Sequence, residues 1–196
     1  MATAAQVDAA VVLWLNGWVG DLPWMDALIR LLVSDYLAPV LISLILLGMW
    51  FGALDSEVRE RQQRAVMRAM IGMGIANLST LIMNQFVFRA RPFVEHPLVV
   101  LFYQPTDSSF PANPAVVGFA MAAGIWSGHR RLGAVAFTLA SLWGFARVYA
   151  GVAYPSDVLF GAALGIAVTV VVAAALRRIE PLPTLVLRLA RRVYLA

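Results

Sequence analysis

The sequence predicts an all-α fold, a polytopic transmembrane helical bundle of five to six spanning helices, and three observations predict it. Of the 196 residues, 61% are hydrophobic and only 13% are charged, and the mean hydropathy is +0.79. Uncharged apolar runs recur along the chain, and at about 1.5 Å per residue the longer ones cross a hydrocarbon core of about 30 Å. Arginines collect in the connections between these runs. We therefore expect residues 1–196 to form a single integral membrane domain.

Residues 1–35 form the least regular part of the pattern. Polar residues interrupt the apolar stretch between positions 7 and 34, and Trp14, Trp18 and Trp24 are typical of a membrane interface. We predict two short helices lying near one membrane surface, with a kinked sixth span as the alternative. Because no basic segment precedes the first apolar stretch, we expect no cleaved signal peptide.

Five uncharged runs within residues 36–178 predict the helical bundle. The third and fourth are short, so each is expected to borrow a turn from its polar flank. Small residues four apart, Gly72 with Ala76 and Gly161 with Gly165, predict close helix packing, either within the chain or at an oligomeric face. The runs cover residues 37–54, 69–88, 114–128, 132–146 and 158–176.

The arginines predict the orientation. Lysine is absent, and 11 of the 15 arginines fall on one side of the bundle. The positive-inside rule makes that side the cytoplasmic face of a bacterial inner membrane. The loop 89–113, the turn 147–157 and the amino-terminal segment then lie outside. Residues 179–196 are predicted to form a cytoplasmic amphipathic tail on the anionic inner leaflet, or else a solvated helical end. The apolar residues of this tail are Leu182, Leu185, Leu187, Leu189, Val193 and Leu195.

Composition also limits the chemistry. Without cysteine the chain has no disulfide, no thiolate nucleophile and no thiolate metal site. The net charge of +4 comes from arginines at membrane boundaries, so we expect no nucleic-acid partner. We expect no metal and no cofactor. The expected partners are membrane lipids, polyprenyl phosphates among them, and other membrane protein subunits.

Three arginines on the outer side are candidate anion ligands. Arg89, Arg91 and Arg147 stand at the ends of predicted spans, where a guanidinium in lipid needs a partner. A phosphate or diphosphate would suit them, because the planar guanidinium makes bidentate bonds to phosphate oxygens. Internal pairing explains them equally well, since three carboxylates lie on the same side: Glu95, Asp107 and Asp157.

Residues 84–157 resemble the type 2 phosphatidic acid phosphatase superfamily, and within it the bacterial undecaprenyl-diphosphatase branch. The resemblance rests on three motifs at conserved spacing. The first ends in Arg91-Pro92 and has Asn84 where the family has lysine. The second is Pro111-Ala112-Asn113-Pro114, where the family has Pro-Ser-(Gly, Asn or Asp)-His. The third runs from Ala146-Arg147 through Ala153 to Asp157, where the family has Ser-Arg, His and Asp. The resemblance implies a helical bundle with its motifs gathered at one membrane face.

The resemblance also implies a role for each position. Arg89, Arg91 and Arg147 would hold phosphate, and Asp157 would orient a nucleophilic imidazole. In a well-studied hydrolase, loss of the nucleophile alone costs about 10⁶ in turnover. The positions of the four other functional residues are altered: the nucleophilic histidine falls on Ala153, the acid histidine on Pro114, the lysine on Asn84 and the serine on Ala112.

Local patterns suggest what replaces the lost chemistry. Asn113 is predicted to cap a helix that has Pro114 at its first position. Asp157 is predicted to lie in the first turn of the last span and to pair with Arg147 or Arg91. Of the two histidines, His129 falls on the predicted inner side, so only His96 could act as a displaced nucleophile or base.

Three functions are compatible with this sequence. The favoured one is a catalytically inactive, lipid-phosphatase-like protein, serving as a structural or accessory subunit of a membrane complex or as a binder of polyprenyl phosphate lipids. The alternative enzyme is a polyprenyl-diphosphate or phosphatidate phosphatase with a non-standard site. A passage for lipid phosphates is the third, and only the arginine cluster favours it.

Overall fold

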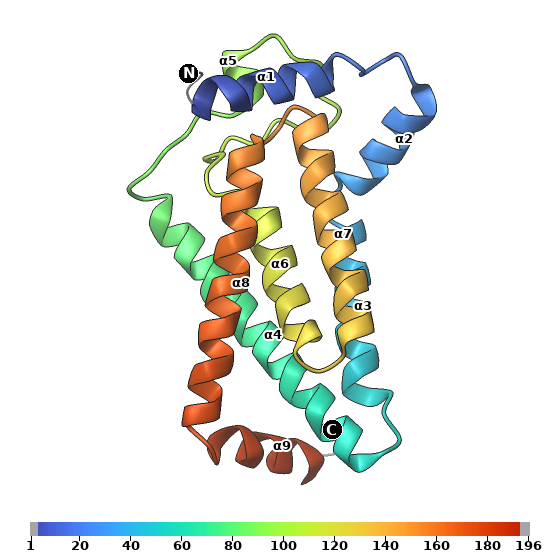
Figure 1. Ribbon diagram of the computed structural model, residues 1–196, viewed down its shortest axis with the longest axis vertical. Helices are drawn as coiled ribbons and strands as arrows, with labels where there is room; N and C mark the ends of the chain where they lie inside the picture. The colour runs from blue at the N-terminus through green and yellow to red at the C-terminus, as the bar shows by residue number, and fades with distance from the viewer. Residues whose placement is uncertain (1–3, 193–196) are drawn as a thin grey trace.

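Nine helices and no strand occur within residues 4–192, the part of the chain that the computed structural model describes (Figure 1). The predicted all-α fold is confirmed. The helices are α1 (Ala4–Asn16), α2 (Pro23–Leu32), α3 (Leu37–Phe51), α4 (Ser56–Met83), α5 (Pro92–Glu95), α6 (Asn113–Trp126), α7 (Arg130–Tyr149), α8 (Pro155–Arg178) and α9 (Leu182–Arg192).

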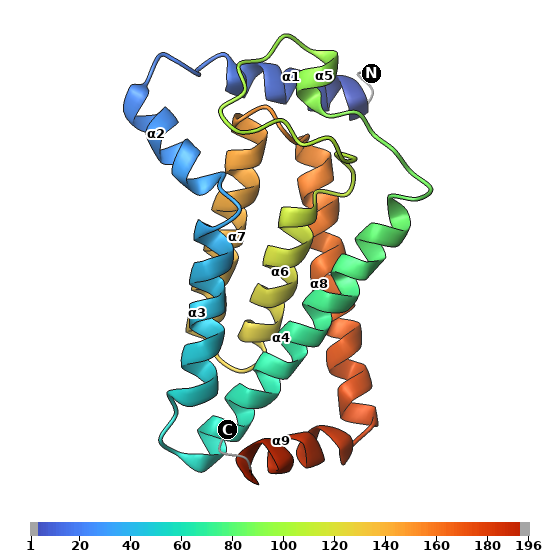
Figure 2. The ribbon, with the colours of Figure 1, turned by 180° about the vertical axis from the view of Figure 1, so that it is seen from behind.

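Helix α6 lies at the centre of the bundle. It packs against α4, α7 and α8, while α3 covers the side formed by α4 and α7 (Figures 1 and 2). The largest apolar cluster joins α3, α4, α6 and α7, and its buried members include Ile42, Met49, Ala69, Ile125 and Ala136. Many of these residues are small, and so the helices approach one another closely.

Glycines make the closest of these approaches possible. A Cβ added at Gly165 of α8 would lie 2.3 Å from the carbonyl oxygen of Val116 in α6. A Cβ at Gly72 of α4 would lie 2.5 Å from Oγ1 of Thr169 in α8. Both small-residue pairs predicted from the sequence therefore supply contacts within the chain, as expected where packing rather than the hydrophobic effect holds helices together in lipid.

Each of the five predicted apolar runs overlaps one helix. Three helices, α4, α7 and α8, are long and apolar enough to cross a membrane, and α2 with α3 forms a further candidate span that is bent by 51°. Helix α6 is apolar but has only 14 residues. At about 1.5 Å per residue it reaches about 21 Å, less than the hydrocarbon core.

The boundaries predicted for the second run were wrong at both ends. The run at 69–88 has no charge, yet α4 begins at Ser56 and ends at Met83. It begins early because the Asp55 side chain caps the helix, accepting hydrogen bonds from the backbone N–H groups of Glu57 (3.0 Å) and Val58 (2.9 Å). An absence of charge marks the part of a helix that suits lipid, whereas the helix itself extends as far as its capping allows.

The amino-terminal segment combines features of both predictions for it. Helix α1 lies across one end of the bundle, and α2 continues into the bent pair with α3 (Figure 1). We call the end of the bundle that α1 crosses the motif end. It holds α1, α5 and the turn 150–154 between α7 and α8. The depth of α1 and α2 in the membrane stays a prediction.

The predicted tail helix is α9, which crosses the opposite end of the bundle (Figure 1). We call this the arginine end, which holds α9, the start of α4 and the turn between α6 and α7. Arg64 of α4 holds the tail through an ion pair with Glu180 and a 2.8 Å bond to Oγ1 of Thr184. Two predicted apolar residues, Val193 and Leu195, lie outside the described residues. The placement of this tail on a leaflet stays a prediction.

Candidate functional site

The three sequence motifs meet at the motif end, although each comes from a different element. Arg89 lies in the irregular segment between α4 and α5, and Arg91 directly precedes α5. Arg147 lies in the last turn of α7, and Asp157 in the first turn of α8. Asp157 therefore starts the last long helix, as predicted. The fold therefore gathers the elements that carry the three motifs at one end of the bundle.

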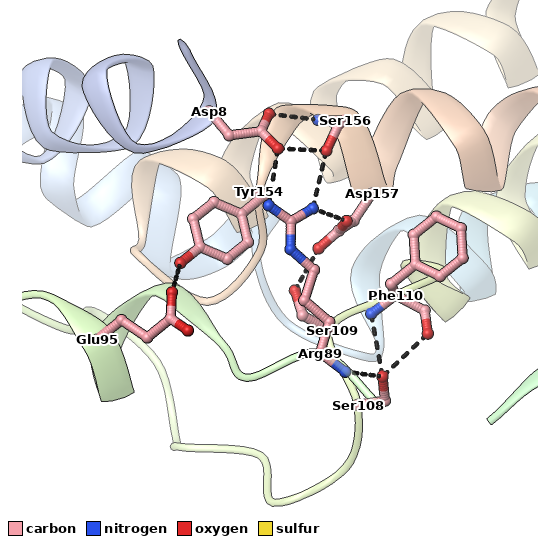
Figure 3. Close-up of polar contacts among 9 residues, drawn as sticks. All are labelled: Asp8, Arg89, Glu95, Ser108, Ser109, Phe110, Tyr154, Ser156 and Asp157. Atoms are coloured by element: carbon pink, nitrogen blue, oxygen red, sulfur yellow. Dashed lines mark hydrogen bonds and ion pairs between the residues drawn. The ribbon is translucent and has the colours of Figure 1, made fainter. Parts of the chain in front are cut away.

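Arg89 lies between two carboxylates (Figure 3). Its Nη1 donates to Oδ1 of Asp157 at 2.5 Å and to Oγ of Ser156 at 2.9 Å, and its Nη2 donates to Oδ2 of Asp8 at 2.8 Å. The second oxygen of Asp157 accepts a 2.5 Å bond from the hydroxyl of Ser109. Asp157 has no exposed surface. The predicted partners of Asp157, Arg147 or Arg91, were wrong, because Arg89 takes this position and the other two arginines point elsewhere.

Asp8 joins helix α1 to this cluster. Its carboxylate accepts bonds from the backbone N–H of Ser156 at 3.0 Å and from the hydroxyl of the same residue. Burial raises the pKa of Asp8, but the hydrogen bonds from Ser156 and from Arg89 together lower it by more, so the pKa lies below its ordinary value. The ionised carboxylate of Asp8 on α1 therefore binds the backbone N–H and the hydroxyl of Ser156 at the start of α8.

Tyr154 closes the other side of Arg89. The guanidinium lies 4.0 Å from the centre of the tyrosine ring, a cation–π distance. The tyrosine hydroxyl donates a 2.7 Å bond to Glu95 at the end of α5 (Figure 3). Burial and this bond raise the pKa of Tyr154 well above its ordinary value. Glu95 thus binds a tyrosine and is not the arginine partner that the sequence offered.

Arg91 is buried, and each of its three guanidinium nitrogens donates at least one hydrogen bond. It donates to the carbonyl of Val152 at 2.6 Å, to the carbonyl of Asp107 at 3.1 Å and to the carboxylate of Asp107 at 2.8 Å. A longer bond of 3.4 Å reaches the carbonyl of Ser108. These bonds tie the 107–108 loop to the turn before α8, so this side chain holds the motif end together.

Arg147 is also buried and pairs with Asp35, which lies in the bend between α2 and α3. Its guanidinium lies 4.6 Å from the ring centre of Phe102 and 5.8 Å from that of Trp143. Its Nε atom is buried without a hydrogen-bond partner among the described residues. The ion pair therefore lies among aromatic rings.

Each of the three arginines at the motif end is paired with a carboxylate. Three guanidinium groups face four carboxylates, and each arginine has at least one direct ion pair. A phosphate that bound Arg89 or Arg91 would have to compete with these internal carboxylates. Of the two explanations that the sequence left open, the geometry matches internal pairing. The carboxylates are Asp8, Asp157, Asp107 and Asp35.

The altered motif positions are built into local structure. Ala153 is buried in the turn before α8, and the backbone N–H of Ala112 donates to the carbonyl of Asp157 at 3.1 Å. The predicted cap at Asn113 was wrong: the N-cap is Ala112 with no side-chain bond, and Asn113 and Pro114 are the first helical residues. Asn84 ends α4, with its Oδ1 buried and unpaired within residues 4–192.

Sequence reasoning missed Asp8 and Asp35, the two carboxylates that come from the amino-terminal segment. Asp8 is 81 residues from Arg89 and Asp35 is 112 residues from Arg147, so no local spacing indicates either contact. A signal did exist, because each is an isolated acid beside apolar residues. A carboxylate in such a position needs a cationic partner.

Comparison with known proteins gives the family. A family model described as the PAP2 superfamily matches residues 65–180. The chain belongs to the PAP2 superfamily. Undecaprenyl-diphosphatase BcrC of Bacillus subtilis (strain 168) is 32% identical over 132 residues, covering 67% of this chain and 65% of that protein. The putative undecaprenyl-diphosphatase YbjG of Escherichia coli (strain K12) is 27% identical, covering 77% of this chain and 73% of that protein.

Solved structures agree on the fold of this PAP2-superfamily chain. A transmembrane PAP2-type phosphatidylglycerolphosphate phosphatase from Bacillus subtilis superposes with a TM-score of 0.63 at 22% identity, covering 91% of this chain and 90% of that one. Aquifex aeolicus LpxE gives a TM-score of 0.64 at 23% identity, covering 85% and 94%. The predicted helical bundle is therefore the PAP2 fold, and the predicted resemblance is confirmed.

Proposed function

We propose that this chain is a non-catalytic member of the PAP2 superfamily that serves as a structural or accessory subunit of a membrane complex. One observation carries the proposal. The two family histidine positions hold Ala153 and Pro114, and the Asp157 carboxylate, which would orient the nucleophile, is bound to Arg89 and Ser109 instead.

The chemistry of these side chains supports the proposal. A methyl group cannot attack phosphorus, and a proline side chain cannot protonate a leaving group. The nucleophile and the general acid would serve the same reaction, and both are missing. The remaining arginines could stabilise a transition state only if another group attacked phosphorus. In a hydrolase with a complete frame, removal of a nucleophile alone costs about 10⁶ in turnover.

The ion pairs favour an accessory role over binding of polyprenyl phosphate. A phosphate binder needs guanidinium groups whose donors are free or are held by weak partners. Here Arg91 donates to three carbonyls and a carboxylate, and Arg89 to two carboxylates. We propose that these bonds hold the motif end closed and that they preserve a stable helical surface for other subunits.

An active polyprenyl-diphosphate or phosphatidate phosphatase is the second candidate. The names of the two curated relatives favour it, as does retention of Arg91 and Arg147. His96 would have to supply the nucleophile. It ends α5 one residue after Glu95, whose carboxylate accepts the Tyr154 bond beside Arg89.

The test is phosphate release from undecaprenyl diphosphate and from phosphatidate by the purified chain, with the Bacillus subtilis undecaprenyl-diphosphatase as the active control. We expect release at the background rate. We expect the same for a Pro114→His, Ala153→His double variant, because Asp157 and the three arginines remain paired internally. Turnover by the wild-type chain that disappears in His96→Ala, or a phosphoramidate adduct trapped at His96, would establish the second candidate instead.

We also propose that the chain lies in a bacterial inner membrane with its motif end outside and its tail in the cytoplasm. The distribution of arginines supports this orientation. Because the natural sequence has no cysteine, single thiols can be introduced cleanly at exposed positions of each end, with Thr106→Cys and Leu54→Cys. An impermeant maleimide added to intact spheroplasts should label the Thr106→Cys variant and leave the Leu54→Cys variant unlabelled. The reverse pattern would show that the orientation is the opposite of the one proposed.

A further inference from the structure

The arginine end carries a cationic cavity that the PAP2 motifs do not include. It has a volume of about 450 Å³ and is lined by Arg61 of α4, by Arg130 and Arg131 of α7, and by His129 and Trp126 beside them. A volume of this size suits a headgroup-sized ligand. No carboxylate lines it.

The three cavity arginines differ from those of the motif end in their partners. Arg89, Arg91 and Arg147 all have carboxylates, as described above. Within the part of the chain that the structure describes, no ion pair or hydrogen bond engages the side chain of Arg61, Arg130 or Arg131. Arg61 also lines a neighbouring hollow with Glu57 and Glu60, but neither forms an ion pair with it within residues 4–192. Three guanidinium groups on one cavity without a direct ion pair attract an anion.

Gly128 allows the start of α7, which carries Arg130 and Arg131, to lie close to Arg61 on α4. A Cβ at Gly128, in the turn between α6 and α7, would lie 2.4 Å from Cβ of Ala65 and 3.2 Å from the carbonyl oxygen of Arg61. Only a residue without a side chain lets this turn lie directly on α4 (Figure 2). The close approach places the start of α7 beside Arg61, so the cavity follows from the fold.

Two further features of the cavity suit a phosphate group at a membrane surface. It lies at the start of the 20-residue helix α7, whose positive end favours an anion. The Nδ1 atom of His129 accepts a 3.3 Å bond from the N–H of Leu132, which leaves Nε2 as the available donor. Trp126 supplies an amphipathic wall of the kind found at headgroup depth.

We infer that this cavity binds the phosphate of an anionic phospholipid headgroup. The chain would thus hold lipid phosphate at the end of the bundle opposite to the PAP2 motifs, through the three cavity arginines. This inference does not depend on whether the motif end is catalytic.

Native mass spectrometry of the detergent-solubilised chain, titrated with phosphatidylglycerol and phosphatidylcholine of matched acyl chains, tests the inference. A direct charge-assisted bond from a guanidinium to a phosphate contributes at least roughly fivefold in affinity beyond the general attraction of an anionic lipid. We therefore expect an Arg61→Gln, Arg130→Gln, Arg131→Gln variant to bind phosphatidylglycerol about a hundredfold more weakly, with little change for phosphatidylcholine. The corresponding triple lysine variant should retain most of the binding.

A matched control removes the same charge from the same end, outside the cavity: Arg177→Gln, Arg178→Gln, Arg188→Gln. We expect it to weaken phosphatidylglycerol binding much less than the cavity variant does, since Arg177, Arg178 and Arg188 do not line the cavity. Equal losses in the two glutamine variants would mean general attraction and would overturn the cavity site. Displacement of the lipid by millimolar inorganic phosphate would assign the site to free phosphate and overturn the lipid assignment.

Discussion

Replacing Asp157 with asparagine is expected to lower the free energy of unfolding by about 3 kcal/mol, because it removes the charge from a buried pair. Asp157 has no exposed surface, and its two oxygens accept from Arg89 and Ser109. Asparagine offers one acceptor oxygen and an NH2 group that only donates, so it cannot accept from both partners in the same way. The measurement is unfolding of the purified chain in mixed micelles, followed by tryptophan fluorescence.

Asp107→Asn is the matched control for this prediction. It makes the same chemical change at the same end, also beside an arginine, but the Asp107 side chain is 61% exposed. Exposed pairs contribute at most about 1 kcal/mol. Arg91 also keeps its carbonyl partners, including Val152. A loss in Asp107→Asn as large as that in Asp157→Asn would contradict the view that the buried pair holds the motif end closed.

Replacing Gly165 with valine is expected to destabilise the bundle by about 3 kcal/mol or to prevent its assembly. A Cβ there would lie 2.3 Å from the carbonyl oxygen of Val116 and 2.9 Å from the backbone nitrogen of Ala120. These atoms belong to the backbone of α6, so no side-chain rotation can relieve the overlap. The central helix would have to move away from α8. Thermal unfolding in detergent, with protein yield as a second readout, measures the effect.

Gly74→Val provides the control for the packing prediction. A Cβ at Gly74, also in a long helix of the bundle, meets nothing within 4 Å. We expect its effect to stay within about 0.5 kcal/mol, as for other surface substitutions. If both valine variants lost similar stability, intrinsic helix preference rather than the contact between α6 and α8 would explain the result.

Much of the fold could be predicted because lipid imposes strong constraints on sequence. The uncharged runs located α7 and α8 to within a few residues, since such runs must be buried in hydrocarbon as helices. The same rule failed for α4, where an Asp55 cap and polar residues extend the helix beyond its apolar part. It also gave no indication that α2 and α3 would meet at 51°.

The candidate site was predictable in position but not in its pairing. The distribution of arginines and the family resemblance indicated that Arg89, Arg91 and Arg147 would gather at one end, and they do. Their partners depend on how α1 and the bend at Asp35 lie on the bundle, which are long-range contacts with no sequence period. The partner predicted for Asp157 was wrong for this reason. The path of residues 84–91 between α4 and α5 places Arg89, rather than Arg91 or Arg147, beside Asp157.

The contact between Asp8 and the start of α8 has an evolutionary consequence. In a working enzyme of this frame, an acid at that place would compete with substrate, so selection would oppose it. In a chain without hydrolysis, as proposed here, the same acid only stabilises the start of α8. Restoring the two imidazoles would then leave Ser156 and Arg89 bound to the Asp8 carboxylate, so recovery of an open site would also require a change at Asp8.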